Sequence, residues 1–583
     1  MRRRSDVNES SFEQDCTRKT SSLGEDRGQG LELVAVPLGR SLRPLAPTSL
    51  DPIRPGTPED APSEHTASPS RRTFLGGVVT ATTLGLMLSL AVPAAFSQPQ
   101  TPPNTDAYGV NAGAQFAEVP LPDLSSEAIG DNPRQRVLRW NDIAMICTAL
   151  DHTPPQQGEE RVFREQFGPV REARALAIVQ IAVFDAVNAV TDNRFRSYTG
   201  LPAVQRPTGL NVAIAQAAHD TLVALWPAQK ATVDKLLAED LAEFPASALK
   251  SRGIALGRRA AAAILAHRAN DGSAHAEPVV GVDYIPGTGP GEWRQDPISL
   301  IPLALGAKWA EVRPFVLRTA DQFQIPPPPA LTSARYTRAF NEVKRLGGDG
   351  ITTPTERTAE QTIAGIYWGY DGTPNLSAPP RLYNQIAVLI ANQRGTGMRN
   401  VVDLARLLAL VHTAMADAGI ACWESKYAYK FWRPVGGIRE ADTDGNPNTI
   451  VDPDFSPLGA PASNINPGVN FTPPFPAYAS GHATFGGALF QTLRRFYGTD
   501  RIRFTFVSDE FNDVTTDNQG NVRPLIPRTF PNLSAAEEEN GQSRIYLGIH
   551  WEFDKTEGIL QGRRIADFVL ANAFQPILSA MPR

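Results

Sequence analysis

The chain has 583 residues, of which 42% are hydrophobic and 20% charged, and its formal net charge is −5. This length exceeds one ordinary domain, and the composition is typical of a soluble globular protein. The acidic balance gives no support to a nucleic-acid partner, so a site for an anion must be a local group of basic side chains. Three cysteines, Cys16, Cys147 and Cys422, are too few for a disulfide framework. The sequence does not decide whether Cys147 and Cys422 form a single bridge.

The N-terminal region resembles an export signal. Residues 1–69 lack a sustained hydrophobic period, which predicts a disordered leader or a start codon placed too early. Ser70-Arg71-Arg72-Thr73-Phe74-Leu75 and the mildly apolar run to Phe96 are similar to a twin-arginine signal. We therefore expect a signal peptide over 70–97 and an exported protein, periplasmic or secreted, without a stable membrane partner after cleavage. The alternative is an uncleaved anchor, since about 20 apolar residues can span a bilayer, and no other stretch is expected to do so.

Residues 98–133 are interpreted as a linker, and residues 134–583 as one largely helical domain. Apolar residues recur there at three- and four-residue spacing, and clusters of Pro and Gly separate the periodic segments. The best strand pattern is Ile502–Val507. We expect an all-α fold of helical bundles with long Pro-rich loops. The expected helices are Arg171–Val190, Asn211–Leu225, Leu249–Ala269, Thr358–Tyr370, Val401–Ala418 and Ala483–Tyr497.

Two basic side chains mark the first of three segments that suggest an oxyanion site. Lys426 and Arg433 are seven positions apart, which places them on one face if a single helix continues through both. Pro434 then discourages continuation of that helix. Two cations on one stripe with no acid between them repel each other unless an anion lies there. A solvated basic face would show the same pattern.

The second segment, Phe475–His482, leads into the helix expected from Ala483. Ser480 and Gly481 would lie at the helix N-terminus, where backbone N–H groups and the helix dipole favour an anion. Glycine lets the backbone approach closely, the serine hydroxyl adds a donor, and His482 can exchange a proton with a bound group. The alternative is a simple N-cap at Ser480 and a surface position for His482.

The third segment runs from Ser543 to Asp554. Arg544 offers planar donors for an oxyanion, and His550 offers an imidazole that can bind a metal or attack phosphorus. Six helical steps would place these two side chains on different faces, so we expect a loop that turns at Gly548 to bring them together. Asp554 would orient the imidazole ring from behind. The alternative is that this segment has no ligand and is only the end of a helix, with its charged side chains in ion pairs.

Together the three segments carry one signature. K-x6-RP, SGH and SR-x5-H-x3-D are shared by the vanadium haloperoxidases and the phosphatidic-acid-phosphatase superfamily, and the chain resembles the chloroperoxidase type of haloperoxidase. The resemblance covers about residues 134–583, places the oxyanion site in 420–583, and departs at Ala479, where Pro is frequent. It is carried by Arg139-Trp140-Asn141, Thr148–Thr153, Tyr367–Asp371, Pro379–Gln385, Trp423–Lys426, Phe431–Pro434, Pro474–Tyr478, Ser543–Leu547 and His550-Trp551.

The resemblance implies a helical haloperoxidase fold, vanadate as the cofactor and a role for each matching residue. His550 would bind the vanadium atom, His482 would be the acid–base group, and Lys426 would also polarise the bound peroxide. Asp371 would hold Arg544, unless it is only a turn residue at a helix end. Trp423 and Phe475 would line the halide pocket, with a purely structural role in the core as the alternative. The oxygens of vanadate would be held by Lys426, Arg433, Ser480, Gly481 and Arg544.

The implied reaction is oxidation of a halide ion by hydrogen peroxide to hypohalous acid. Because phosphate and vanadate are alike in shape and charge, the same pocket would suit an acid phosphatase with His550 as its nucleophile. A non-catalytic oxyanion-binding protein would keep Arg433 and Arg544 but would not need His482. The aromatic residues and the long helical N-terminal part favour the haloperoxidase. The sequence assigns neither a preferred halide nor an oligomeric state.

Overall fold

A computed structural model describes residues 106, 108–109, 114–116, 129–156, 159 and 161–577. The chain divides into Met1–Leu88 and Ser89–Arg583, and every described residue belongs to the second unit. The expected leader over 1–69 and the signal peptide over 70–97 therefore lie outside the described residues. The expected all-α class is confirmed, because the described residues form thirteen α-helices and only two small two-stranded sheets.

The helices differ widely in length, and the strands are short. The helices are α1 (Pro133–Asp151), α2 (Pro169–Val190), α3 (Leu210–Leu225), α4 (Lys230–Ala242), α5 (Ala248–Arg268), α6 (Ala334–Leu346), α7 (Ala359–Tyr367), α8 (Pro379–Gln393), α9 (Val401–Tyr429), α10 (Pro434–Arg439), α11 (Gly481–Tyr497), α12 (Leu533–Tyr546) and α13 (Glu552–Asn572). Strands β1 (Gln115–Phe116) and β2 (Ile465–Asn466) pair antiparallel, as do β3 (Phe504–Val507) and β4 (Pro527–Phe530).

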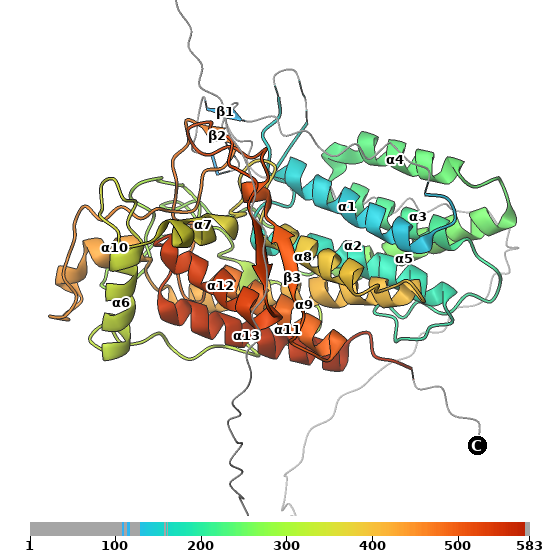
Figure 1. Ribbon diagram of the computed structural model, residues 1–583. Coiled ribbons are helices and arrows are strands. Elements are labelled where there is room, and N and C mark those ends of the chain that lie inside the picture. The colour runs from blue at the N-terminus through green and yellow to red at the C-terminus, as the bar shows by residue number, and fades with distance from the viewer. Residues whose placement is uncertain are drawn as a thin grey trace, which may run out of the picture. The chain divides into compact units, whose positions relative to one another are not determined.

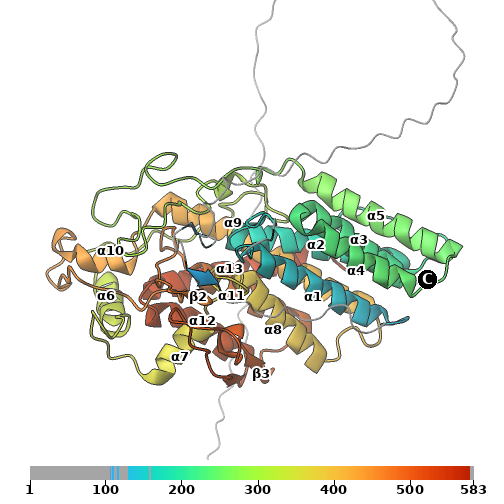
Figure 2. The same ribbon diagram turned by 90° about the horizontal axis from the view of Figure 1, so that it is seen from above.

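Helix α9 connects two groups of helices. Helices α1 to α5, coloured cyan to green, lie together in both views, and the orange and red helices α11 to α13 form a second group (Figures 1 and 2). Helix α9 contacts α2 of the first group and α11 and α13 of the second. Nearly all residues of α9 up to Tyr427 are buried, as expected for a helix that is apolar around most of its circumference.

Most of the expected helices are found close to their predicted bounds. Helices α2, α3, α5 and α11 begin and end within two residues of the expected positions. Helix α7 is shorter than expected, because Thr358 caps it from outside and it ends at Tyr367. Helix α9 continues past Ala418 to Tyr429, because Gly419 does not end it: a Cβ there would lie 3.0 Å from the ring of Phe485, so glycine allows α11 to pack closely.

Two described helices have the length and hydropathy of a membrane span, contrary to the expectation that only the N-terminal run would. They are Pro169–Val190 and Val401–Tyr429, and 89% and 94% of their most apolar windows are buried inside the protein. Such burial is typical of core helices. Cys147 and Cys422 are also buried in this core as free thiols, so the bridge left open by the sequence does not form.

A buried carboxyl group, that of Glu172, lies in the first turn of α2. Glu172 is inaccessible to solvent, and its Oε2 accepts hydrogen bonds from Ser377 Oγ at 2.6 Å and from the Ala378 backbone N–H at 3.1 Å. Burial raises the pKa of Glu172 to about 8. The group is therefore held in its protonated form in the folded protein near neutral pH.

We predict that Glu172→Gln changes how stability depends on pH. The unfolded glutamate loses its proton near its ordinary pKa of about 4.5, whereas the folded one keeps it to about 8. This group therefore lowers the free energy of unfolding by about 1.4 kcal/mol per pH unit as the pH rises between these values. Glutamine does not ionise, so the stability of the variant relative to wild type should rise from pH 5 to pH 8 in urea unfolding. A constant difference would contradict the prediction.

Candidate active site

The three predicted segments meet at the N-terminus of α11. The Ser480 backbone N–H donates to the Asp554 carbonyl at 3.0 Å, which joins the second segment to the third. Arg433 Nη1 lies 2.9 Å from His550 Nε2, which joins the first to the third. Lys426 Nζ donates to the carbonyls of Pro476 and Ala477 at 2.9 and 3.1 Å and to that of Ala479. The convergence expected from the sequence is therefore present.

His550 is held by a carboxylate on the first turn of α13. Asp554 Oδ2 lies 2.8 Å from His550 Nδ1 and accepts the Trp551 backbone N–H at 3.0 Å. This contact assigns the proton to Nδ1 and leaves the lone pair on Nε2. Burial and the nearby Arg433 cation hold the pKa of His550 well below its usual value. The imidazole is therefore neutral, as a metal ligand or nucleophile must be.

Gly548 provides the predicted turn between Arg544 and His550. Arg544 lies in the last turn of α12, which ends at Tyr546, and α13 begins at Glu552. Gly548 has a φ of +73°, a left-handed conformation that side chains disfavour. A Cβ at this position would collide with the carbonyl oxygen of Gly347. Glycine is required here for both reasons.

Lys426 and Arg433 do not share a helical face, so that expectation was wrong. Helix α9 ends at Tyr429, and Lys430 caps it in the left-handed conformation with a φ of +49°. Pro434 begins α10 at a position where proline needs no N–H partner, instead of ending a helix. The two cations nevertheless reach the same place, because the chain turns back between the helices.

The two basic side chains of the first segment differ in what they can offer a ligand. Arg433 donates from Nε to the Phe475 carbonyl and from Nη1 to the Ile549 carbonyl, both at 2.8 Å, and its buried Nη2 has no partner among the described residues. Lys426 directs its ammonium group at backbone carbonyls, and burial lowers its pKa to about 7. Lys426 would have to give up one carbonyl to contact an anion.

Asp371 and Arg544 form a buried ion pair at the site. Arg544 Nη2 lies 2.6 Å from Asp371 Oδ1, and Nε and Nη1 of Arg544 are buried without partners among the described residues. Asp371 lies in the loop after α7, far from Arg544 in sequence. The arrangement matches the role that the resemblance implies for Asp371. It fixes the guanidinium and leaves two nitrogen atoms for a ligand.

The SGH segment begins α11. Ser480 is the N-cap, and its Oγ accepts the Ala483 N–H at 3.4 Å. His482 is 6% exposed, so the alternative of a surface position is wrong. Its Nε2 lies 2.7 Å from the Gly369 carbonyl, which assigns the proton to Nε2 and leaves Nδ1 as an acceptor. Burial, followed by the Arg544 cation, lowers the pKa of His482 well below its usual value.

The catalytic and anion-binding candidates surround a pocket that has an aromatic wall. Trp423 and Phe475 pack with ring centroids 4.9 Å apart, and both line the pocket although both are more than 90% buried. Gly481 lies beneath Trp423, since a Cβ there would be 3.0 Å from the indole. Of the predicted residues, Asp371, Trp423, Phe475, Gly481, His482, Arg544 and His550 line this pocket, whereas Lys426, Arg433 and Ser480 lie behind its surface.

Sequence reasoning missed Tyr108 in the wall of this pocket. Its hydroxyl donates to the Asp371 carbonyl at 2.6 Å, and its ring packs on Phe167 and Phe471. Tyr108 belongs to the 98–133 segment that was expected to be a linker. A single tyrosine outside any hydrophobic period gives no signal, so only the folded structure reveals it.

The donor set of the site is suited to an anion. No group of three or more His, Cys, Asp or Glu side chains that could hold a bare metal ion occurs in the part of the chain that the structure describes. Arg433 and Arg544 instead offer three unpartnered N–H-bearing nitrogen atoms beside the neutral His550. Fixed cationic donors around one imidazole lone pair favour a tetrahedral oxyanion that can also bond to that nitrogen.

Comparisons with known proteins agree with this geometry. Residues 406–578 match the family model of the VCPO second helical-bundle domain. The chain is 40% identical over 269 residues to the vanadium chloroperoxidase of Curvularia inaequalis, in a match that covers 40% of this chain and 43% of that protein. The chain thus spans less than half the length of that relative.

Solved structures with the same fold include two bacterial enzymes. One is described as the first bacterial vanadium-dependent iodoperoxidase, with a TM-score of 0.60 and 24% identity over 78% of this chain and all of that one. The other is an apo bacterial vanadium-dependent chloroperoxidase, with a TM-score of 0.51 and 19% identity over 69% of this chain and 93% of that one. At these identities the likeness shows the fold. Residues 406–578 are thus similar to the VCPO second helical-bundle domain, and the chain shares its fold with these two bacterial enzymes.

Proposed function

We propose that the protein is a vanadate-dependent haloperoxidase that oxidises a halide ion with hydrogen peroxide to hypohalous acid. The observation that carries the proposal is the neutral His550, held by Asp554, beside unpartnered nitrogen atoms of Arg433 and Arg544. The 40% identity to a vanadium chloroperoxidase supports the choice of activity. The aromatic wall of Trp423 and Phe475 supports a small, weakly hydrated ion such as a halide as the substrate.

The residues of the site fit vanadate. A buried N–H group without a partner costs free energy, so three such guanidinium nitrogen atoms at one place favour binding of an oxyanion. Arg433, Arg544 and Lys426 would hold its oxygens, together with the Ser480 hydroxyl and the Gly481 N–H at the start of α11. His550 Nε2 would bind the vanadium atom. Bound vanadate would supply a Lewis-acid centre that activates hydrogen peroxide without a change of oxidation state.

The remaining residues of the pocket would move protons and position groups. His482, with a free lone pair on Nδ1, can take a proton from one oxygen and return it to another. Asp371 keeps the Arg544 guanidinium in place through the ion pair of 2.6 Å. Trp423 and Phe475 exclude water, which strengthens electrostatic interactions inside the pocket.

The second candidate is an acid phosphatase of the same superfamily. His550 Nε2 would then attack phosphorus, and His482 would give a proton to the leaving group. The Asp554 contact that makes His550 a good ligand would also make it a good nucleophile. The two activities therefore share one pocket and must be separated by assay.

One experiment separates the candidates. The purified protein is incubated with orthovanadate, and peroxide-dependent halogenation of monochlorodimedone is measured with chloride, bromide and iodide. Hydrolysis of a phosphate ester is measured without vanadate. We expect halogenation only after vanadate is added. Ester hydrolysis without halogenation would favour the phosphatase, and inactivity in both assays would favour a non-catalytic oxyanion-binding protein.

We also propose that the protein is exported to the periplasm or the medium by the twin-arginine route. The support is the Ser70-Arg71-Arg72 motif and the apolar run that follows it. We predict that replacing Arg71 and Arg72 with lysine leaves the protein inside the producing cell, whereas the wild type is exported with a new N-terminus near Ser97. Cell fractionation and N-terminal sequencing check both points. Export of the lysine variant, or wild-type protein that keeps its apolar run, would contradict the proposal.

A further inference from the structure

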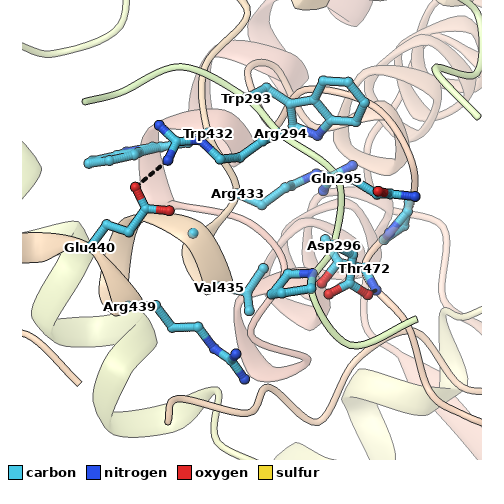
Figure 3. A pocket seen from close by; sticks show the side chains of 13 residues that line it. Trp293, Arg294, Gln295, Asp296, Trp432, Arg433, Val435, Arg439, Glu440 and Thr472 are labelled. Atoms are coloured by element: carbon cyan, nitrogen blue, oxygen red, sulfur yellow. Dashed lines mark hydrogen bonds and ion pairs between the residues drawn. The ribbon is translucent and has the colours of Figure 1, made fainter. Parts of the chain in front are cut away.

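A second recess lies beside the active site and is formed largely by α10 and two loops. It holds about 550 Å³ of space, part of which is open to solvent. Figure 3 shows its walls, which come from residues 293–297, from 432–440 and from Thr472 and Pro473. Arg433 lines this recess while its Nη1 contacts His550, and Pro473 lines both cavities. The side chain of Arg433 therefore lies between the recess and His550 of the active site.

The apolar surface of the recess is rigid. Trp293 and Trp432 are 98–99% buried, so their indoles are fixed by the surrounding structure. Pro297, Val435 and Pro473 complete the apolar lining. The proline rings present broad faces that suit an aromatic ring, and the buried indoles make the wall behind them rigid. This part of the recess favours an aromatic ligand over an aliphatic one.

The polar surface of the recess has an excess of positive charge. Of the two acids, Glu440 pairs with Arg294, and Asp296 accepts hydrogen bonds from Ser299 Oγ at 2.7 Å and from the Thr472 N–H at 3.0 Å, so three arginines face two carboxylates. Arg439 donates through Nε to the Phe455 carbonyl. Arg439 and Arg433 have no carboxylate at ion-pair distance among residues 106–577 that the structure describes. The charge of Arg439 is left for a ligand of the recess, whereas Arg433 contacts His550 and would hold vanadate.

Two deeply buried polar groups in the same lining lack partners. The hydroxyl of Thr472, a residue 2% exposed, and Nη2 of Arg433, also 2% exposed, make no hydrogen bond to any described residue. Because unpartnered buried polar groups are costly, such groups in the wall of a recess indicate a polar ligand. Thr472 offers the recess one hydroxyl in addition to the guanidinium of Arg439, whereas Nη2 of Arg433 is expected to donate to vanadate.

From this combination we propose that the recess binds a small aromatic carboxylate. The ring lies against Pro297, Val435 and Pro473, and the carboxylate is held by Arg439, with the Thr472 hydroxyl as a further donor. The site is separate from the oxyanion pocket, needs no vanadate and does not depend on the proposed haloperoxidase activity.

The probe is benzoate, measured by isothermal titration calorimetry on the purified full chain without vanadate. Benzamide keeps the ring and removes the charge, and acetate keeps the charge and removes the ring. We expect benzoate to bind about tenfold more tightly than either, because a charge-assisted hydrogen bond and a stacked ring each contribute about that factor. Equal binding of benzamide or acetate, or no binding of benzoate, would overturn the proposal.

Gly436 allows the recess to be blocked without disturbing its walls. A Cβ at Gly436 would meet no heavy atom within 4 Å, so a larger side chain there extends into open space. We expect Gly436→Phe to abolish benzoate binding and Gly436→Ala to keep it within about twofold, because a single methyl group leaves the recess open. Arg439→Gln should weaken binding about tenfold, since the charge of the main donor is lost.

The location of any binding is checked with the same variants. Melting temperatures should match wild type for all three, because neither position is packed in the core. Benzoate binding that persists in Gly436→Phe and Arg439→Gln but is lost in Arg544→Ala would place benzoate in the oxyanion pocket and overturn the proposal. Because halogenation is assayed separately, failure here and failure of the proposed activity are distinguishable.

Discussion

His550→Ala is expected to abolish vanadate-dependent halogenation and to leave the fold intact. The imidazole supplies the one neutral nitrogen lone pair that faces the Arg433 guanidinium, and alanine removes it without adding bulk. We expect halogenation to fall at least about 1,000-fold, as for removal of a group that bonds directly to the reacting centre. The affinity for vanadate should also fall, about 10- to 100-fold or more, and calorimetry with vanadate measures this effect without the assay of activity.

Two further variants control for this result. His275→Ala removes an imidazole that lies outside the pocket, and it should leave activity near the wild-type value. Asp554→Asn keeps His550 but weakens the contact of 2.8 Å that fixes its proton, so an intermediate loss of vanadate affinity is expected. Halogenation by His550→Ala at the wild-type rate would show that this side chain is not the ligand.

Gly548→Ala is expected to be the most destabilising single change near the site. The variant would combine a left-handed backbone conformation at a φ of +73° with a collision against the Gly347 carbonyl, and its Cβ would lie 2.9 Å from Pro457 Cβ. Strain and overpacking together predict a loss of about 3 kcal/mol or more in the free energy of unfolding. The loop between Arg544 and His550 should also shift, so halogenation should fall in the fraction that stays folded.

Gly200→Ala is the matched control for backbone strain. Gly200 has a φ of +76°, close to that of Gly548, but a Cβ there would meet no heavy atom within 4 Å. It should therefore lose only the conformational part, about 1 kcal/mol. Chemical denaturation of both variants measures the difference. Equal losses at the two positions would mean that the contact with Gly347 is relieved at little cost.

Local patterns in the sequence predicted the parts of the site that depend on local geometry. The N-cap at Ser480 and the start of α11 follow from residue types alone, and the Arg544–His550 spacing required a turn where Gly548 lies. Helix bounds were best where hydrophobic periodicity was strong, as in α2 and α3. Roles taken from the family resemblance placed Asp371 on Arg544, which no local pattern could have done.

The errors came from contacts between distant segments. Seven-residue spacing implied one helix through Lys426 and Arg433, but the αL conformation of Lys430 lets the chain turn so that Arg433 reaches the Phe475 and Ile549 carbonyls. Considered alone, Gly419 is compatible with the end of a helix. In the fold it instead allows α9 to pack closely against Phe485 of α11. Such choices depend on tertiary partners that propensity and periodicity do not encode.

The tyrosine hydroxyl on the Asp371 carbonyl has a practical consequence for how this protein is produced. Tyr108 lies well before α1, so a shortened gene that starts at the helical region would omit one residue of the pocket lining. Such a product would keep every residue of the three signature segments and still lack the hydroxyl that contacts the Asp371 carbonyl.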